Sequence, residues 1–420
     1  MTQSSNLSFY GLGVAPRILE VLDRLKFVVP TPIQHKAIPI AIEGKDIIGV
    51  AQTGTGKTLA FVIPIMQRFI QKRGRCLVLV PTRELAIQVD KTFQKIAPIF
   101  GIRTAVIIGG ASMYLQVQAL RRNPQVLIAT PGRLLDHISQ RTVTLGNVSI
   151  LVLDEADRML DMGFLPQLEQ IFPLIPKERQ TMLFSATIPP DVLKIATLHM
   201  KLPVCVEIAP LGTTAERITQ ELFIVKKETK RRLLEKLLLQ YHGSVLLFTR
   251  TKIGARRTAR MIRDMGHSAA EIHSDRTLAQ RRDALEGFKS GRYRILVATD
   301  IAARGIDVVG IELVINYDLP QDAINYIHRI GRTGRAGHDG RAISFATPEQ
   351  GVDVRNIEKL IKTALPVSEH PEFPRENLIY YPKEPAGANR QGAYSYGRRP
   401  KPYPRHRHRF DRFSVHHRKR

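Results

Sequence analysis

Two adjacent carboxylates, Asp154 and Glu155, end an apolar run in the segment SILVLDEADR at 149–158. Like charges at neighbouring positions repel, so such a pair needs either a nearby cation or full solvation. A solvated acidic turn is the weaker alternative, because the preceding run is too apolar to lie at the surface. The pair therefore indicates a site that holds a cation.

A glycine-rich segment suited to phosphate binding, AQTGTGKT, spans residues 51–58 between an apolar run and a helix-like one. Backbone N–H groups of such a loop surround phosphates, and the following helix N-terminus adds positive potential. The loop residues expected around the phosphates are Gln52, Thr53, Gly54, Thr55 and Gly56. Lys57 would reach the outer phosphates and Thr58 would bind Mg²⁺. Ala51 stands where the general pattern has Gly, and a glycine-rich turn without function is the alternative.

The two segments predict one site. In a parallel sheet, ligands bind at the carboxyl ends of the strands, and both segments follow apolar strand-like runs. Successive strand residues point in opposite directions. Asp154 would therefore face Mg²⁺ while Glu155 faces a water aligned with the γ-phosphate, and the cation would offset the repulsion between the carboxylates.

The elements that position these residues form two series of short apolar runs separated by amphipathic segments. Strands are expected to begin near residues 46, 75, 104, 126, 150, 181 and 204, and again near 221, 244, 269, 295, 313 and 342. Unbroken apolar strands of this kind are buried on both faces, which is typical of doubly wound parallel α/β domains. The sequence thus predicts an N-terminal domain at 1–208, a linker at 209–217, a C-terminal domain at 218–366 and a basic, disordered tail at 367–420.

Charge and composition narrow the class of partner. The 420 residues hold 63 Lys and Arg against 38 Asp and Glu, a net charge of +25 that favours a polyanion such as nucleic acid over the alternative of a merely soluble basic protein. Cys76 and Cys205 are too few for a disulfide framework, and both are expected to be buried. No signal peptide or membrane-spanning run is recognisable, so the expected location is the cytoplasm.

The last 37 residues, 384–420, carry eleven Lys and Arg against two acids, a net charge of +9, without apolar periodicity. This composition predicts a disordered basic tail. Its histidines, His406, His408, His416 and His417, could bind a metal, but solvated basic character is the favoured interpretation.

Ten motifs occur in one order along the chain, and together they resemble those of the DEAD-box RNA helicases, the bacterial RhlE-like members most closely. The resemblance covers about residues 8–350. The motifs are Phe9, PTPIQ ending at Gln34, AQTGTGKT, PTREL at 81–85, Gly109-Gly110, TPGR at 130–133, DEAD at 154–157, SAT at 185–187, ATDIAARGID at 298–307 and HRIGRTGR at 328–335.

The resemblance implies two tandem RecA-like domains and a set of residue roles. Phe9 would stack on adenine, with a purely structural role as the alternative, and Gln34 would hydrogen-bond the edge of the base. Asp307 would hold the ribose. The remaining roles are coupling of nucleotide state to domain closure by Ser185, Thr187 and His328, and contact with the γ-phosphate by Arg332 and Arg335. The spacing of Arg329, Arg332 and Arg335, three residues apart among glycines, favours a loop that faces a ligand over a solvated face.

RNA is expected to bind across both domains through its backbone, with little base information. The residues implied are Thr82, Arg83, Gly110, Thr130 and Arg133 in the first domain and Arg250 and Thr299 in the second. Three departures from the family pattern, Ser274, Leu278 and Lys26, lie away from the hydrolytic groups.

The implied activity is that of a monomeric, RNA-dependent ATPase that separates short duplexes, with ATP and Mg²⁺ as cofactors and ribosome assembly or RNA decay as family pathways. Two rivals stay open at this level: an ATP-gated clamp on RNA, and a helicase that translocates on DNA.

Overall fold

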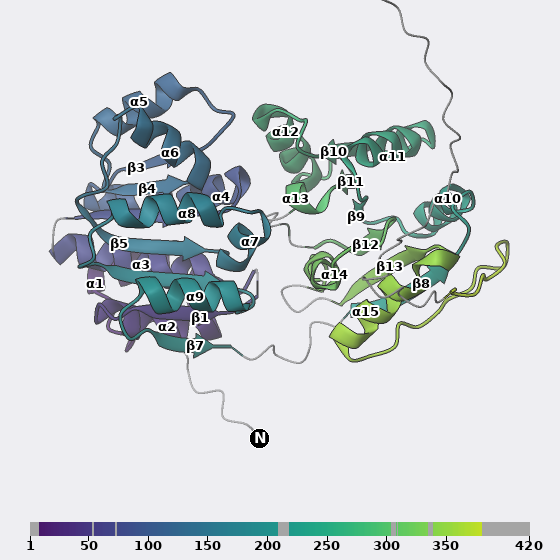
Figure 1. Cartoon of the computed structure of the whole chain (residues 1–420), viewed down its shortest axis with the longest axis horizontal. Coiled ribbons are helices and arrows are strands. Elements are labelled where there is room, and N and C mark those ends of the chain that lie inside the picture. Colours follow the sequence, from purple (N-terminus) through teal and green to yellow (C-terminus); the bar gives the residue numbers. More distant parts are fainter. Residues whose placement is uncertain are drawn as a thin grey trace, which may run out of the picture. The chain divides into compact units, whose positions relative to one another are not determined.

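The structure, a computed structural model, describes residues 8–52, 54–71, 74–208, 218–303, 308, 310–334 and 339–379 (Figure 1). Within these residues, each predicted apolar run forms one strand, and the strands form two separate parallel sheets. Among the helices of this part of the chain, none is long and apolar enough to cross a membrane.

The N-terminal sheet has the strand order β3-β4-β2-β5-β6-β1-β7. Its strands are β1 (Ile47–Val50), β2 (Arg75–Leu79), β3 (Thr104–Ile107), β4 (Val126–Ala129), β5 (Val148–Asp154), β6 (Gln180–Ser185) and β7 (Val204–Glu207). All pairings are parallel, so the carboxyl ends of all these strands lie at one edge. Strands β1 and β2 follow each other in the sequence but are separated in the sheet by β5 and β6. The strand order therefore switches between them, and ligands of parallel α/β sheets bind at such switch points.

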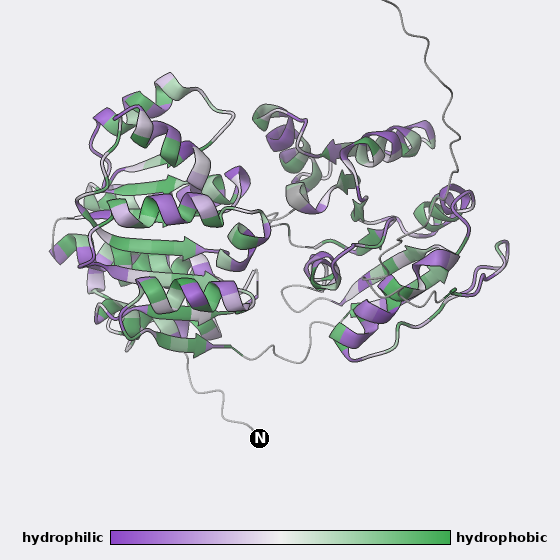
Figure 2. Cartoon of the chain, viewed as in Figure 1, coloured by the Kyte–Doolittle hydropathy of each residue, from purple (hydrophilic) through white to green (hydrophobic). Residues whose placement is uncertain are grey.

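Helices cover both faces of this sheet. They are α1 (Pro16–Arg24), α2 (Pro32–Ile42), α3 (Lys57–Gln71), α4 (Arg83–Ile96), α5 (Met113–Arg121), α6 (Pro131–Ser139), α7 (Ala156–Asp161), α8 (Leu165–Ile171) and α9 (Pro190–His199), with 3-10 turns η1 (Ala97–Phe100) and η2 (Phe172–Leu174). The apolar sides of α1–α4 pack in one cluster and those of α5–α9 in another, on opposite faces. Figure 2 shows the apolar strands between helices whose outer sides are hydrophilic.

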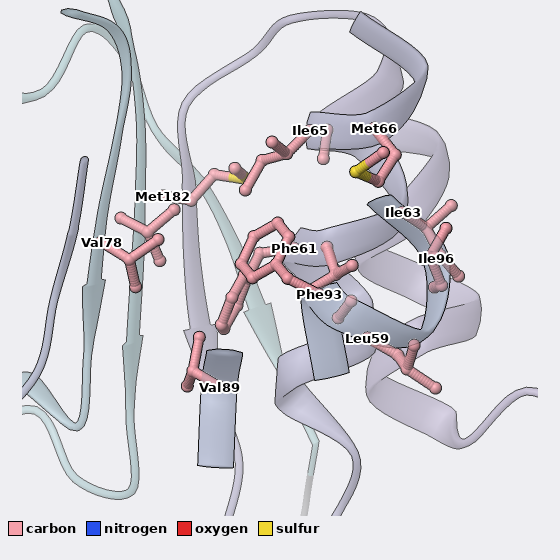
Figure 3. Close-up of a cluster of buried hydrophobic side chains, with 14 of the residues drawn as sticks. Leu59, Phe61, Ile63, Ile65, Met66, Val78, Val89, Phe93, Ile96 and Met182 are labelled. Carbon is pink, nitrogen blue, oxygen red and sulfur yellow. The ribbon is translucent and has the colours of Figure 1, made fainter. Parts of the chain in front are cut away.

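A hydrophobic core between the sheet and helices α3 and α4 fixes α3, the helix that follows the phosphate loop (Figure 3). Phe61 of α3 lies 6.5 Å from Phe93 of α4 and 5.5 Å from Phe184 of β6, measured between ring centroids. All three rings are fully buried. Each ring buries on the order of 200 Å² and so fixes α3 against the sheet. Packing of this kind holds the N-terminus of α3 in place relative to the ends of β1 and β6.

The C-terminal sheet repeats the design with the strand order β10-β11-β9-β12-β13-β8. Its strands are β8 (Ile218–Ile224), β9 (Val245–Phe248), β10 (Ala269–Ile272), β11 (Ile295–Ala298), β12 (Leu313–Asn316) and β13 (Gly340–Ala346). Its helices are α10 (Lys230–Gln240), α11 (Lys252–Asp264), α12 (Leu278–Lys289), α13 (Asp300–Ala303), α14 (Ala323–Ile330) and α15 (Gly351–Ile361), with the 3-10 turn η4 (Pro348–Gln350). Apolar residues of α10 and α11 pack on one face, and those of α12, α14 and α15 on the other.

Residues 366–379, here called the C-terminal strap, run along the edge strand β8. The backbone N–H of Leu222 donates to Pro366 at 2.8 Å, and its carbonyl accepts from the N–H of Ser368 at 2.9 Å. Further along, the N–H of Glu376 donates to Ile224 at 3.1 Å. The predicted start of a disordered tail at residue 367 is therefore wrong for this stretch, because the strap completes the sheet edge. The disorder predicted for 380–420 falls outside the described residues.

Phe373 anchors the strap. Its ring is 5% exposed and packs with the cluster formed by α10, α11 and the sheet, and the Arg232 guanidinium lies 5.3 Å from its centroid. We expect Phe373→Ala to lower the free energy of unfolding of the C-terminal domain by about 3 kcal/mol, the low end for a buried aromatic. Urea denaturation measures this loss. Ile379→Ala, at a 43% exposed position of the same strap, is the control and should change stability by less than about 0.5 kcal/mol.

Two local predictions need correction or explanation. Cys76 is buried as predicted, but Cys205 is exposed, because β7 is an edge strand of the sheet. Lys26, where the family pattern has Gly, adopts a φ of +60° after the end of α1. The N–H groups of Lys26 and Phe27 donate to Asp23 and Leu22, the hydrogen bonds of a Schellman helix end, which is why glycine suits this position.

Candidate active site

Three strand ends bring the predicted catalytic segments together in the N-terminal domain. β6 pairs with β1 on one side and with β5 on the other, with Val50 opposite Ser185 and Asp154 opposite Phe184. The phosphate loop, the SAT segment and the acidic pair therefore follow three adjacent strands at the same edge of the sheet. This is the arrangement expected from the parallel topology.

The phosphate loop leads directly into α3. Gly54 and Gly56 have φ values of +86° and +85°, in the left-handed region that favours glycine. A Cβ at Gly56 would also lie 2.4 Å from Nε2 of Gln34, so no side chain fits there. The Thr55 hydroxyl donates to the Gln52 carbonyl at 2.7 Å and so closes the turn. Thr53 lies outside the described residues.

Lys57 is the first residue of α3 and only 6% exposed, and its ammonium donates to the Ala51 carbonyl at 2.8 Å. Thr58 follows it and is half-buried. A buried ammonium at the N-terminus of a 15-residue helix, above a loop with two left-handed glycines, suits the terminal phosphates of a nucleotide. The residues present thus fit ATP.

Gln34 joins the phosphate loop to α2. Its Oε1 accepts from the N–H of Thr31 at 2.9 Å, and its Nε2 donates to the Gly56 carbonyl at 2.9 Å. Both ends of the amide are thereby fixed, and each keeps one further bonding position for a base edge. Phe9 is 3% exposed within the hydrophobic cluster of α1–α4, which is the structural role left open as its alternative. Its contact with adenine stays a prediction.

Asp154 is the last residue of β5 and 2% exposed. Burial raises the pKa of Asp154 to about 6, and Lys57 acts in the opposite direction. Its Oδ1 accepts from the N–H of Glu155 at 3.0 Å. A buried carboxylate beside a phosphate loop is a hard oxygen ligand of the kind Mg²⁺ prefers, so the site fits that ion together with Thr58. Nowhere among the described residues does a group of three or more His, Cys, Asp or Glu side chains form a metal site.

Glu155 is not part of strand β5, so one prediction from the sequence is wrong in its reason. Alternation along a strand predicts that Asp154 and Glu155 point in opposite directions. β5 instead ends at Asp154, and Glu155 has φ +54° and ψ +50°, an uncommon conformation for a residue with a side chain. Its carboxylate accepts two hydrogen bonds from Nη1 of Arg158, both at 2.7 Å. Arg158 was not among the predicted site residues, although an i, i+3 acid–base pair in this loop was visible in the sequence.

Asp157 connects residues 154–157, here called the acidic loop, with the SAT segment. Its Oδ2 accepts from the backbone N–H groups of Ala186 and Thr187 and from the Thr187 hydroxyl, while its own N–H donates to the Ser185 hydroxyl. Burial alone would raise the pKa of Asp157, but the Lys57 ammonium, the hydrogen bond from the Thr187 hydroxyl and the nearby Arg158 charge outweigh it and hold the pKa below its usual range. A physical link between Ser185, Thr187 and the acidic loop is therefore present.

The predicted RNA-binding residues of the first domain gather at the ends of β2, β3 and β4. Thr82 caps α4 by accepting from the N–H of Leu85, and Arg83 lies so close to Gly110 that a Cβ there would be 2.2 Å from its Nη1. Thr130 precedes α6, and Arg133 donates to the Ala111 carbonyl at 3.3 Å. The three loops thus pack against each other and form one surface.

The C-terminal domain places its candidates at the same kind of edge. Arg250 and Thr299 follow the adjacent strands β9 and β11. His328 lies on α14, and its carbonyl accepts from Nε of Arg332, which is 3% exposed. Asp307 and Arg335 lie outside the described residues.

Arg329, which the sequence grouped with Arg332 and Arg335 as facing a ligand, has an internal role instead. It is 1% exposed, and its guanidinium donates to Asp300, to Asn316 and to the Asp318 carbonyl. These contacts tie α14 to α13 and β12, so this arginine has no donor group directed at solvent.

Comparison with known proteins gives matches along most of the chain. Residues 31–195 match the family model of the DEAD/DEAH box helicase, and residues 229–337 match the helicase conserved C-terminal domain. The ATP-dependent rRNA helicase RRP3 of Debaryomyces hansenii is 44% identical over 87% of this chain and 77% of its own length. The DEAD-box ATP-dependent RNA helicase CshA of Geobacillus kaustophilus is 43% identical over 84% and 77%, respectively.

Solved structures agree in fold. Dbp5 of S. cerevisiae bound to RNA and ADP BeF3 has a TM-score of 0.76 at 32% identity and covers 86% of this chain and 95% of its own. Mss116p bound to ssRNA and AMP-PNP has a TM-score of 0.79 at 28% identity, over 89% and 82%, respectively. The similarity thus extends through both sheets of the chain. These matches do not assign the chain to the RhlE-like subgroup, which stays a prediction.

Proposed function

The chain belongs to the DEAD-box ATP-dependent RNA helicases, and from this premise we propose that it uses ATP to separate short RNA duplexes or to remodel RNA–protein complexes. The observation that carries the proposal is the meeting of the phosphate loop, the acidic pair and the SAT segment at the ends of β1, β5 and β6. Its two RecA-like domains each supply part of the machinery, so ATP and RNA would act by closing them together.

In this proposal the N-terminal domain binds the nucleotide. Gln34 reads the base, the loop N–H groups and Lys57 hold the phosphates, and Asp154 and Thr58 hold Mg²⁺. The bound ion would offset the negative charge of the phosphates and polarise the γ-phosphoryl group. Glu155 would orient the attacking water and accept its proton.

The C-terminal domain would complete the site. Asp307 would contact the ribose, and Arg332 and Arg335 would stabilise charge on the transferring phosphoryl group, as arginine fingers do. Arg250 and Thr299 would continue the RNA surface begun by Thr82, Arg83, Gly110, Thr130 and Arg133. Relatives of this chain named RRP3 are rRNA helicases, so an RNA of ribosome assembly is the favoured substrate class. RNA decay is the alternative pathway.

The test is ATP turnover and strand separation with matched RNA and DNA duplexes of the same sequence. We expect turnover to depend on RNA and duplex separation to follow it. Turnover without separation would favour an ATP-gated clamp, and equal stimulation by DNA would favour a DNA helicase.

Gln34→Ala should remove selectivity for adenine. The wild-type protein should hydrolyse ATP and reject GTP, because GTP reverses the donors and acceptors opposite a fixed amide and leaves buried groups unpaired. Gln34 is fixed at both ends by Thr31 and Gly56, so it is suited to this discrimination. Steady-state hydrolysis of both nucleotides measures the ratio. Equal use of ATP and GTP by the wild-type protein would show that Gln34 does not read the base.

Deleting residues 384–420 should weaken RNA binding at low salt and leave turnover at saturating RNA unchanged. The segment carries a net charge of +9 with interleaved tyrosines and phenylalanines, which suit phosphates and unpaired bases. If about five of its cations contact single-stranded RNA, the log–log salt slope falls by about 3.5, roughly a hundredfold in affinity between 50 and 200 mM salt. Titration of labelled RNA measures both quantities. Identical slopes for the two proteins would indicate a solubilising extension without an RNA-binding role.

A further inference from the structure

The start of α7 departs from the usual chemistry of a helix N-terminus. Glu155 occupies the N-cap position, where a side chain normally accepts from a backbone N–H two or three residues later. The Glu155 side chain makes no such bond. Its two carboxylate oxygens accept instead from the side chain of Arg158, both at 2.7 Å. The capping function passes to neighbours, since the N–H of Asp157 donates to Ser185 and that of Arg158 to the Asp157 carboxylate.

The ion pair between Glu155 and Arg158 is buried, and burial of two charges needs an explanation. The side chain of Arg158 is 1% exposed and that of Glu155 is 4% exposed. Two buried charges lose their hydration, and an apolar pair of similar volume is often as stable or more so. Stability alone therefore does not account for an arginine here. Nη2 of Arg158 has no hydrogen-bond partner in the described part of the chain, so the guanidinium makes its side-chain hydrogen bonds there with Glu155 alone.

The geometry suits positioning of a reactive carboxylate. A single nitrogen, Nη1, contacts both oxygens, which fixes the plane and the rotamer of the Glu155 side chain. A carboxylate offers about four lone-pair sites, and Nη1 uses two of them, so the group can still accept a hydrogen bond from water. The guanidinium also places a positive charge close to Asp154 and Asp157.

We propose that Arg158 is a positioning residue for hydrolysis: it holds the Glu155 carboxylate in the orientation from which that group acts on the attacking water. The inference rests on the proposed function, in which Glu155 is the catalytic residue. Arg158 itself touches neither nucleotide nor water in this scheme. Its loss would leave Glu155 free to rotate while the phosphate loop and the RNA surface stay intact.

The experiment compares Arg158→Met, which keeps an unbranched apolar stem without the guanidinium, and Arg158→Lys, which keeps the charge, with Arg179→Met as the control. Arg179 is a half-buried arginine of the same domain that donates to Pro176 and His199 at the far end of β6. We expect Arg158→Met to lower kcat roughly a hundredfold, the scale of misplacement by about 1 Å. KM for ATP and RNA affinity with AMP-PNP should change less than about twofold. Arg158→Lys should recover part of kcat, and Arg179→Met should keep it.

A second readout does not depend on turnover. Glu155→Gln leaves the Arg158 charge buried without its partner, so this variant should melt at a lower temperature than the wild type. Adding Arg158→Met to Glu155→Gln should restore part of that loss, and RNA affinity with AMP-PNP should match that of Glu155→Gln alone. Independent effects of the two substitutions on melting, or wild-type kcat in Arg158→Met, would overturn the proposal. Absence of RNA-stimulated turnover in the wild-type protein would instead refute the proposed function.

Discussion

Glu155→Gln is expected to lower ATP turnover by about 10³- to 10⁴-fold, the upper range for removal of a general base. The amide can still accept one hydrogen bond from water but cannot take its proton. Glu155 lies beside the buried Asp154 at the end of β5, and none of its contacts holds the phosphate loop or the RNA surface. ATP-dependent RNA binding should therefore persist, and the closed ATP- and RNA-bound state should accumulate.

Single-turnover hydrolysis and RNA binding with ATP, measured on one preparation, check both halves of this expectation. Glu178→Gln is the control, because that side chain is 88% exposed in the same domain and pairs with Lys201 at the surface. Turnover at the wild-type rate in Glu155→Gln would remove Glu155 from the catalytic role. Loss of RNA binding along with turnover would point to a structural role for the acidic loop.

Arg335→Ala is expected to lower turnover by about 10³-fold, the low end for an arginine that acts on a γ-phosphate. The expectation comes from the position of Arg335 in the HRIGRTGR motif, three residues after Arg332, which itself follows the end of α14. RNA binding without nucleotide should hardly change, since the residue is assigned to the nucleotide and not to the RNA.

Rapid-quench hydrolysis at saturating RNA measures the effect, with Arg257→Ala on the exposed side of α11 as the control for loss of one positive charge. The control should keep its turnover. A weaker RNA affinity combined with normal turnover at saturating RNA would transfer Arg335 from the catalytic set to the RNA-binding set.

The strands were predictable from sequence because each is a short apolar run buried on both faces. In the sequence, parallel strands of this kind are unbroken runs of apolar residues, and each predicted run forms one strand. The phosphate loop and the acidic pair were predictable for a related reason. The chemistry needs fixed residue types at strand ends, so their order along the chain reports their position in the sheet.

The features that the sequence did not reveal depend on contacts between side chains or on whether a strand lies at the edge or in the centre of its sheet. The pairing of Glu155 with Arg158 follows from the left-handed turn at Glu155, and strand alternation offered no sign of it. Cys205 looked buried because its strand is apolar, but β7 lies at the sheet edge. Phe373 lay in a stretch without apolar periodicity, so its burial under Arg232 was invisible to a pattern search.

The C-terminal strap has a consequence for the behaviour of the protein in concentrated solution. An uncovered edge strand presents free N–H and C=O groups to other chains and is a common origin of intermolecular sheet formation. The backbone groups of Leu222 and Ile224 on β8 would be such groups, and the strap occupies them. A C-terminal domain cut before residue 366 would carry this edge bare, beside the apolar surface vacated by Phe373. Aggregation of such a fragment would therefore report a missing cover and not an inability of the domain to fold.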